Sequence, residues 1–257
     1  MSGVFFCSCG TKFKKCSNFN KHIEVCEHYV KTDGTYQVTT LGNKLYGWKI
    51  FSDDLLYRTP KQKIYESQRL LDIPQNSSFL DVGAHWGDTV CTLALFARNN
   101  GRDDIRFFAF EPNKDKCDFI KEISNRNNLN IQVFNNCVGN NNNTVVMSDK
   151  SNFGGNCVYV ESENSDIKTI KLDDIKEMIE PVGYMHIDVE GWESKVIDGA
   201  NSILNNQANK IYIFAECLTD DEETSILNEI KKHDYERLED YSENGERNII
   251  FIINNRI

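Results

Sequence analysis

Two glycines and an acidic residue stand between two apolar stretches, and their spacing predicts a ligand-binding turn. Asp81, Gly83 and Gly87 follow the apolar residues 79–80 and precede the apolar run 90–97. The first stretch predicts a buried parallel strand and the second a helix. Glycine adopts backbone conformations that other residues resist and lets a ligand approach the main chain closely. A strand, a glycine turn and a helix N-terminus in this order predict a site for a nucleotide-like ligand, with a plain strand–turn–helix as the alternative.

The glycine spacing, Gly83-x-x-x-Gly87, differs from the G-x-G-x-x-G of dinucleotide sites. A D-x-G-x-x-x-G turn is more typical of enzymes that bind S-adenosylmethionine. His85 lies inside the turn, and Asp88 is expected to be the N-cap of the helix. Glu111 ends the next predicted strand, where a carboxylate can accept both hydroxyls of a ribose. The alternative for Glu111 is an exposed side chain that caps the helix from Asn113. Cys137, with amide side chains before it, ends the third predicted strand, where an adenine edge would lie.

The fourth predicted strand carries three ionisable residues at every second position. His186, Asp188 and Glu190 should therefore point to one face. A central parallel strand is normally apolar on both faces, and buried ionisable groups are costly unless they are paired. This pattern predicts a reaction site at the end of the strand. The alternatives are a satisfied polar network, or a pairing of Asp188 with a lysine.

Alternating strands and helices from residue 78 onward must position these groups. The predicted strands are 78–83, 105–111, 131–138, 184–189 and 209–216. The predicted helices are 88–98, 113–127, 172–180, 192–204 and 220–233, with an irregular stretch from about 139 to 171. A final antiparallel hairpin should pair 235–239 with 248–254. The alternation predicts an α/β fold in which helices cover both faces of a mostly parallel sheet.

The first 30 residues contain four side chains with the spacing of zinc ligands: Cys7, Cys9, His22 and Cys26. Twelve residues separate Cys9 from His22 and three separate His22 from Cys26, so the segment resembles a Cys-Cys-His-His zinc finger with a ββα arrangement. His28 is a competing fourth ligand, and Cys16 could substitute in a rearranged site. Zinc would supply the folding energy of so short a segment. The alternative is a small helical cap with chance cysteines.

We therefore expect a zinc-finger segment in residues 1–30, a linker with a helix in 31–75, and the main domain in 76–257. The finger is locally basic, so it could dock nucleic acid or a protein, or be purely structural. The whole chain has a formal net charge of −10, which argues against broad binding of nucleic acid or anionic membranes. The apolar runs are too short to span a bilayer, and no signal-peptide core is present. The nine cysteines, odd in number and clustered at one end, favour a metal site and free thiols in a reducing, cytoplasmic compartment.

Five motifs occur in an order that resembles the FkbM family of S-adenosylmethionine-dependent methyltransferases: Leu80-Asp81-Val82-Gly83-Ala84, Phe110-Glu111-Pro112, Thr169-Ile170-Lys171-Leu172-Asp173-Asp174, His186-Ile187-Asp188-Val189-Glu190-Gly191-Trp192-Glu193 and Val196-Ile197-Asp198-Gly199-Ala200. The resemblance covers roughly residues 78–217. It implies a class I methyltransferase fold, Rossmann-like, with a seven-stranded sheet whose last strand is antiparallel. It also implies O-methylation, often of sugar or polyketide hydroxyls.

The resemblance assigns cofactor binding to Asp81, Gly83, Gly87 and Glu111, and the active-site face to Asp188 and Glu190. His85 stands where asparagine is usual, and His186 where lysine is usual, so the general base stays open. We expect an S-adenosylmethionine-dependent O-methyltransferase that acts on a hydroxyl of a sugar or glycan. His186 or Glu190 would accept the hydroxyl proton, and Asp188 would orient cofactor or acceptor. The alternative is a nucleic-acid-binding or RNA-modifying protein that docks through the finger.

Overall fold

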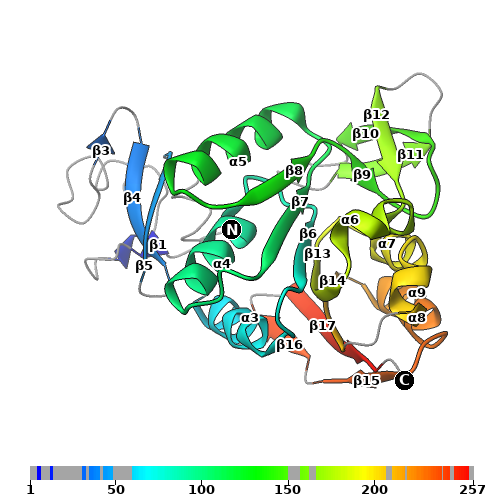
Figure 1. Cartoon of the computed structure of the whole chain (residues 1–257). Coiled ribbons are helices and arrows are strands. Elements are labelled where there is room, and N and C mark those ends of the chain that lie inside the picture. The colour runs from blue at the N-terminus through cyan, green and yellow to red at the C-terminus, as the bar shows by residue number, and fades with distance from the viewer. Residues whose placement is uncertain are drawn as a thin grey trace.

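A mostly parallel sheet forms the centre of the fold, and the strand before the glycine turn lies in its middle (Figure 1). In this computed structural model, β6 (Ser78–Val82) pairs in parallel with β7 (Arg106–Phe110) and with β13 (Val182–Ile187). The flanking parallel strands are β8 (Ile131–Phe134), beside β7, and β14 (Ile211–Cys217), beside β13. All of β6 and β13 is buried, as expected for interior strands. The structure describes residues 5–6, 12–13, 31–32, 35–40, 43–48, 60–149, 157–161, 166–206, 210–217, 219–238, 240–243 and 246–254.

The last strand of the chain runs against the others. β17 (Glu246–Ile253) is antiparallel to β14, and its other edge pairs with β15 (Tyr235–Arg237) and β16 (Tyr241–Glu243). The strand order is β15-β17-β14-β13-β6-β7-β8. The predicted C-terminal hairpin is confirmed, and so is the predicted fold class with its antiparallel last strand.

Helices cover both faces of this sheet, because successive strand residues point to opposite sides and each side is apolar. Phe79 belongs to the core on one face and Leu80 to the core on the other. The first face is covered by α3 (Pro60–Asp72), α4 (Asp88–Asn99) and α5 (Lys114–Arg126). The second face is covered by α6 (Lys176–Ile179), α7 (Glu193–Asp198), α8 (Asn201–Asn206) and α9 (Asp220–Ile230) (Figure 1).

A second sheet replaces part of the predicted third strand and the stretch expected to be irregular. The predicted strand 131–138 divides into β8 and the two-residue strand β9 (Cys137–Val138). β9 pairs in parallel with β12 (Ile167–Ile170). β12 pairs antiparallel with β10 (Thr144–Asp149), which pairs antiparallel with β11 (Cys157–Glu161). The expectation of an irregular stretch is therefore wrong for the described residues 144–149, 157–161 and 167–170, where β10 pairs with the next strand β11 and β12 pairs with both β10 and the more distant β9.

The predicted helix 192–204 is interrupted at Gly199, between α7 and α8. A Cβ on Gly199 would lie 2.0 Å from the carbonyl oxygen of Gly139, so only glycine permits this approach of the helix to the end of β9. Asp173, in the short 3-10 helix η1 (Leu172–Ile175), caps the start of α8. Its two carboxylate oxygens accept hydrogen bonds from the backbone N–H groups of Ser202 and Ile203, at 2.8 and 3.0 Å. The predicted helix 172–180 is accordingly η1 followed by the single turn of α6.

The N-terminal part is described only as strands. β1 (Phe5–Phe6) pairs antiparallel with β2 (Lys12–Phe13). β3 (Lys31–Thr32), β4 (Thr35–Thr40) and β5 (Asn43–Trp48) form an antiparallel sheet, and β5 lies against α4 and α5. The four predicted zinc ligands lie outside the described residues, so the zinc site stays a prediction: Cys7, Cys9, His22 and Cys26.

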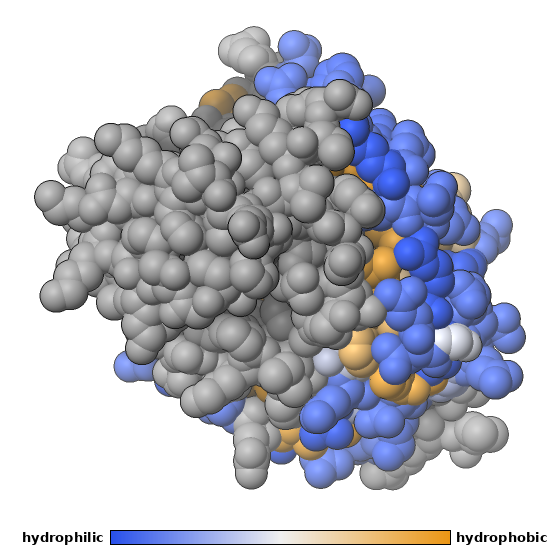
Figure 2. Space-filling model, turned by 90° about the vertical axis from the view of Figure 1, so that its left-hand side faces the viewer, coloured by the Kyte–Doolittle hydropathy of each residue, from blue (hydrophilic) through white to orange (hydrophobic). Residues whose placement is uncertain are grey.

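The surface of the described part is mainly hydrophilic. Val146 and Met178 are the exposed large hydrophobic residues found there. Figure 2 shows one side of the molecule, where hydrophilic side chains predominate among the described residues and smaller hydrophobic areas lie between them. Within the described residues, no helix combines the length and the apolar character needed to cross a membrane.

Candidate functional site

The glycine turn after β6 brings the ends of three strands together. Gly83 has a φ of 86°, in the left-handed region that favours glycine. The backbone N–H groups of Gly83 and Ala84 both donate to the carbonyl oxygen of Phe110, at 3.0 Å each, which joins the turn to the end of β7. A Cβ on Gly83 would lie 1.9 Å from the carbonyl oxygen of Asp188, which follows β13. Glycine is therefore required at position 83 because the backbone of Asp188 leaves no room for a Cβ.

The start of α4 is built differently from the expectation that Asp88 is its N-cap. Gly87 is the N-cap, with a φ of 79° and no side-chain capping bond. Asp81 supplies the missing acceptor from inside β6, because its Oδ2 accepts a hydrogen bond from the backbone N–H of Val90 at 3.1 Å. A buried carboxylate at this place also faces the positive end of the helix dipole. Asp81 thus fixes the helix to the strand beneath the turn.

Glu111, at the end of β7, holds the glycine turn from the other side. Its Oε2 accepts a hydrogen bond from the backbone N–H of His85 at 2.9 Å, and its Oε1 accepts one from Asn113 at 2.8 Å. The side chain is buried, so the alternative of an exposed cap is wrong; Asn113 itself caps α5 through its side chain. Burial raises the pKa of Glu111 above its usual range, although nearby Lys116 and the two N–H groups oppose this.

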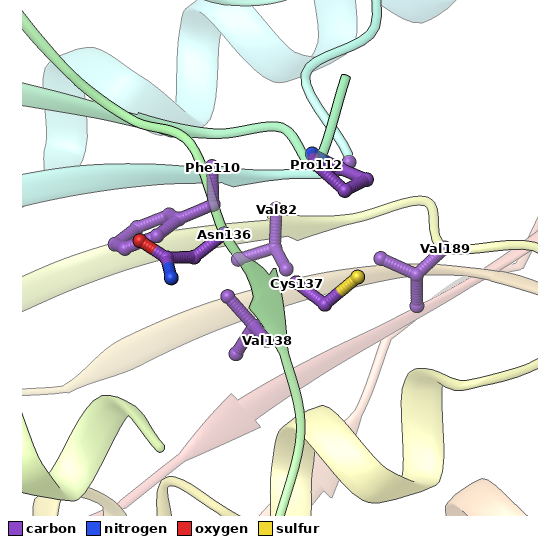
Figure 3. A pocket seen from close by; sticks show the side chains of 8 residues that line it. Val82, Phe110, Pro112, Asn136, Cys137, Val138 and Val189 are labelled. Carbon is purple, nitrogen blue, oxygen red and sulfur yellow. The ribbon is translucent and has the colours of Figure 1, made fainter. Parts of the chain in front are cut away.

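A pocket opens between the ends of β6, β7 and β9, beside Gly83 (Figure 3). Its walls are mostly apolar, with one amide and one thiol among them: Val82, Gly83, Phe110, Pro112, Asn136, Cys137, Val138 and Val189. Cys137 is thus placed in the wall of the pocket, as a buried cysteine that forms no disulfide. Apolar walls with a few polar groups are typical of sites for small organic ligands.

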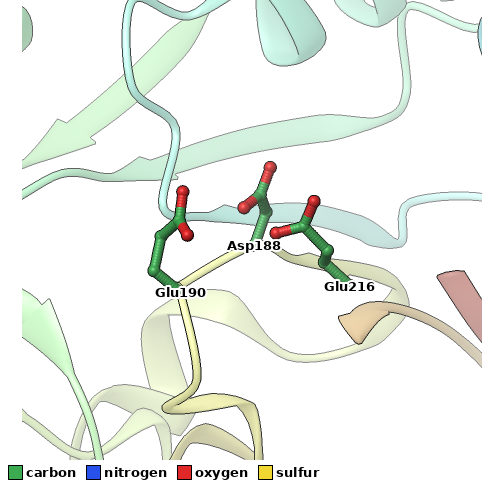
Figure 4. A group of neighbouring side chains, drawn as sticks. All are labelled: Asp188, Glu190 and Glu216. Atoms are coloured by element: carbon green, nitrogen blue, oxygen red, sulfur yellow. The ribbon is translucent and has the colours of Figure 1, made fainter. Parts of the chain in front are cut away.

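Three carboxylates gather where β13 and β14 end. Asp188, Glu190 and Glu216 place oxygen atoms within 4.8 Å of one another, and all three side chains are partly exposed. Figure 4 shows their carboxylates pointing to the same side. Such a group can accept hydrogen bonds and a proton from a hydroxyl, and its oxygens are also the ligands that hard divalent cations prefer. Sequence reasoning found Asp188 and Glu190 but missed Glu216, whose strand neighbour is known only once β13 and β14 are paired in register.

His186 does not belong to this group, which corrects the prediction of one shared set of three. It lies deeper, 2% exposed, with its Nδ1 2.9 Å from Oε1 of Glu66 in α3. Its ring stacks on Phe214, with centroids 5.3 Å apart. β13 ends at Ile187, so Asp188 and Glu190 lie beyond the strand whereas His186 remains inside the core. His186, which we expected to contact the acceptor, is instead paired with Glu66 inside the core.

Glu193 is a further residue at this place, and sequence reasoning assigned it no role. Its Oε1 accepts hydrogen bonds from the backbone N–H groups of Val189 and Gly191, at 3.1 and 3.2 Å. The side chain is buried at the first turn of α7. Burial raises the pKa of Glu193 to about 7, with a smaller contribution from the charge of Asp188. Hydrogen bonds from the backbone N–H groups of Glu193 itself, Gly191 and Val189 oppose this rise.

Comparison with known proteins gives a family match for this chain. Residues 81–237 match the model of the methyltransferase FkbM domain, which is more than half of the chain. Comparison with curated proteins gives no match.

Solved structures with a similar arrangement include three methyltransferases. An O-methyltransferase from Bacillus cereus in complex with SAH is 12% identical, with a TM-score of 0.48, over 76% of this chain and 82% of that one. A SAM-dependent O-methyltransferase from Thermotoga maritima is 11% identical, with a TM-score of 0.47, over 99% and 92%. Precorrin-6y C5,15-methyltransferase from Geobacter metallireducens is 12% identical, with a TM-score of 0.48, over 78% and 91%. These likenesses are too distant to transfer any residue's role.

Proposed function

The chain belongs to the FkbM methyltransferase family, and from this premise we propose that it transfers the methyl group of S-adenosylmethionine to a hydroxyl group of a sugar or glycan. The family and the fold support methyl transfer from this cofactor. The choice of a hydroxyl acceptor rests on the three carboxylates at the strand ends.

The cofactor's adenosine part fits the residues around the glycine turn. In this proposal the adenine ring packs on the apolar side chains beside Gly83, and the Asn136 amide offers a polar contact at its edge. Glu111 stands next to this pocket, after Phe110 in its wall. Each carboxylate oxygen can accept more than one hydrogen bond, so the bonds from His85 and Asn113 leave capacity for ribose hydroxyls. In this proposal Asp81 and Gly87 act indirectly, by fixing the start of α4.

S-adenosylmethionine supplies an electrophilic methyl carbon, so the chain's own residues need only align the acceptor and take up its proton. The acceptor oxygen would bond to that carbon as the carbon–sulfur bond breaks, and the hydroxyl would then have to lose its proton. Glu190 or Asp188 accepts this proton, because both carboxylates are partly exposed and both flank Val189, which lies in the wall of the pocket. Glu216 accepts a hydrogen bond from a neighbouring hydroxyl. We give His186 no part in this step, since it is buried against Glu66.

The acidic character of the site favours a neutral acceptor with several hydroxyls. A nucleic acid would bring phosphates close to three carboxylates in a chain whose net charge is already −10. Nucleic-acid binding usually depends on the opposite charge, which neutralises phosphates. A sugar presents adjacent hydroxyls that several carboxylate oxygens can accept at once. The single observation that carries the proposal is the cluster of three carboxylates where β13 and β14 end, two of which flank Val189 in the wall of the apolar pocket.

The test is a transfer assay with methyl-labelled S-adenosylmethionine. Mono- and oligosaccharides are the expected acceptors, and RNA, nucleosides and simple amines are included as competitors. Label in an alkali-stable methyl ether of a sugar supports the proposal. Label in RNA or in an amine, with none in a sugar, contradicts it.

A further inference from the structure

Glu193 binds the main chain of the loop that carries the candidate proton acceptors, Asp188 and Glu190. Its Oε1 accepts the backbone N–H groups of Val189 and Gly191, the two neighbours of Glu190. One oxygen atom thus accepts hydrogen bonds from the main chain on both sides of Glu190. Glu193 itself is held at the start of α7, where its side chain is 2% exposed.

The backbone of this loop has a conformation that needs the two hydrogen bonds to Glu193. Glu190 has a φ of 56° and Gly191 one of 100°, so two consecutive residues lie in the left-handed region. A residue other than glycine in that region costs on the order of 1–3 kcal/mol and persists where its surroundings hold it. On the other side of the loop, Val189 packs against the glycine turn, because its Cγ1 would lie 3.2 Å from a Cβ on Gly83. The loop is therefore fixed between Glu193 and the cofactor pocket.

We propose that Glu193 is the positioning residue of the site: by binding the main chain on both sides of Glu190, it sets the direction in which the Asp188 and Glu190 carboxylates meet the acceptor. This inference rests on the proposed methyl transfer. Glu193 does not touch cofactor or acceptor in this proposal. What it contributes is an acceptor oxygen, and a neutral amide oxygen at the same place should serve equally well.

Three substitutions separate the acceptor oxygen from the charge. Glu193→Gln keeps an oxygen of the same reach and removes the charge. Glu193→Ala removes the oxygen, and Glu193→Asp keeps the carboxylate but shortens its reach by one methylene. The control is Asp173→Ala. Asp173 is another carboxylate that accepts two backbone N–H groups, but these belong to α8 and not to the loop around Glu190.

The measurements are kcat and KM with the acceptor identified by the transfer assay, the affinity for S-adenosylhomocysteine, and the melting temperature. We expect kcat to fall at least about tenfold in Glu193→Ala and less in Glu193→Asp, since small displacements of reacting groups cost large factors in rate. Glu193→Gln should retain kcat, and cofactor affinity should be unchanged in all variants. Asp173→Ala should lower the melting temperature but leave kcat unchanged. If Glu193→Gln loses as much kcat as Glu193→Ala, or if Glu193→Ala melts earlier with full kcat, the inference is wrong.

Amide hydrogen exchange tests the same inference without an acceptor. The amides of Val189 and Gly191 should be protected in the wild-type protein and in Glu193→Gln, and should lose protection in Glu193→Ala or Glu193→Asp. Protection that persists in both shortened variants overturns the inference. Failure of the proposed function is a different result: the wild-type protein would bind no S-adenosylhomocysteine and transfer no methyl group, whatever the exchange of these two amides.

Discussion

Gly83 and Asp188 are in contact through their main chains, since a Cβ added to Gly83 would lie 1.9 Å from the Asp188 carbonyl oxygen. The same segment binds β6 directly, because the Asp188 N–H donates to the carbonyl oxygen of Val82 at 3.0 Å. The proposed cofactor turn and the proposed reaction site are therefore two sides of one junction between β6 and β13. A substitution in the turn should therefore also alter the reaction site, and the reverse.

Gly83→Ala should be strongly destabilising. The new Cβ meets a backbone oxygen that cannot move aside, and the left-handed conformation adds about 1–2 kcal/mol. We expect the free energy of unfolding to fall by about 3 kcal/mol or more. The control is Gly101→Ala, where φ is 74° but nothing lies within 4 Å of the new Cβ, so only the conformational cost applies. Urea unfolding measures both, and equal losses would show that the Gly83–Asp188 contact does not matter.

The carboxylates should act on turnover and not on folding. Asp188→Asn and Glu190→Gln remove a proton acceptor from partly exposed positions, so we expect kcat to fall by roughly 10²–10⁴-fold for the one that is the base. Glu216→Gln should have a smaller effect because it keeps a hydrogen-bond acceptor. Glu236→Gln, an exposed charge removed from β15, is the control. Steady-state kinetics with the identified acceptor give the answer, and unchanged kcat in all three site variants would place the chemistry elsewhere.

The buried pair of His186 and Glu66 should support the fold. Glu66→Ala leaves the imidazole without its 2.9 Å partner, and losing one member of a buried pair costs about 3–5 kcal/mol. Glu66→Gln keeps a hydrogen-bond acceptor and should cost less. Thermal or urea unfolding measures the loss. His186→Gln should likewise lower stability while its kcat per folded molecule stays the same; a large fall in kcat would return His186 to the catalytic role that the sequence suggested.

Glu193 should make the protein less stable as the pH rises from 5 to 8. Its pKa is about 7 in the folded protein against 4.5 for an ordinary glutamate, so between these values the folded state holds a proton that the unfolded chain has released. The stabilisation is complete below pH 4.5 and is lost as the pH passes 7. Each pH unit of this interval is worth about 1.4 kcal/mol, which gives a total of about 3 kcal/mol.

Urea unfolding at pH 5 and pH 8 measures this effect. Glu193→Gln cannot titrate, so its stability should change less between the two pH values, by about 3 kcal/mol. The same pH dependence in both proteins would mean that Glu193 is not a buried titrating group.

Much of the fold was predictable because its signals are local. The strand before Gly83, the strand ending at Glu111 and the C-terminal hairpin are each marked by a compact apolar run and a turn. The second sheet was not predictable in this way, since β9 has two residues and pairs with β12, some thirty residues later. Short strands of this kind become visible only through their partners.

The site was predictable where a residue type is unusual for its place, and not where a contact determines the role. Asp188 and Glu190 stood out against an apolar strand. Glu216 carries no such mark until β14 is paired with β13. Glu193 resembles any acidic residue in the first turn of a helix, where such residues are common. The partner of His186 is Glu66, in a helix 120 residues away, and no local pattern links them.

The central claim is that S-adenosylmethionine binds between the glycine turn and Glu111, and calorimetry with S-adenosylhomocysteine tests it most directly. Glu111→Gln removes the charge that would accept the ribose hydroxyls, and Glu122→Gln removes an exposed charge on α5 as the control. We expect one equivalent to bind to the wild-type protein and to Glu122→Gln with equal affinity. In Glu111→Gln the affinity should fall by at least about tenfold, as a hydrogen bond to a charged group is worth about 1.5–3 kcal/mol. No binding to the wild-type protein, or the same affinity in all three proteins, would contradict the account.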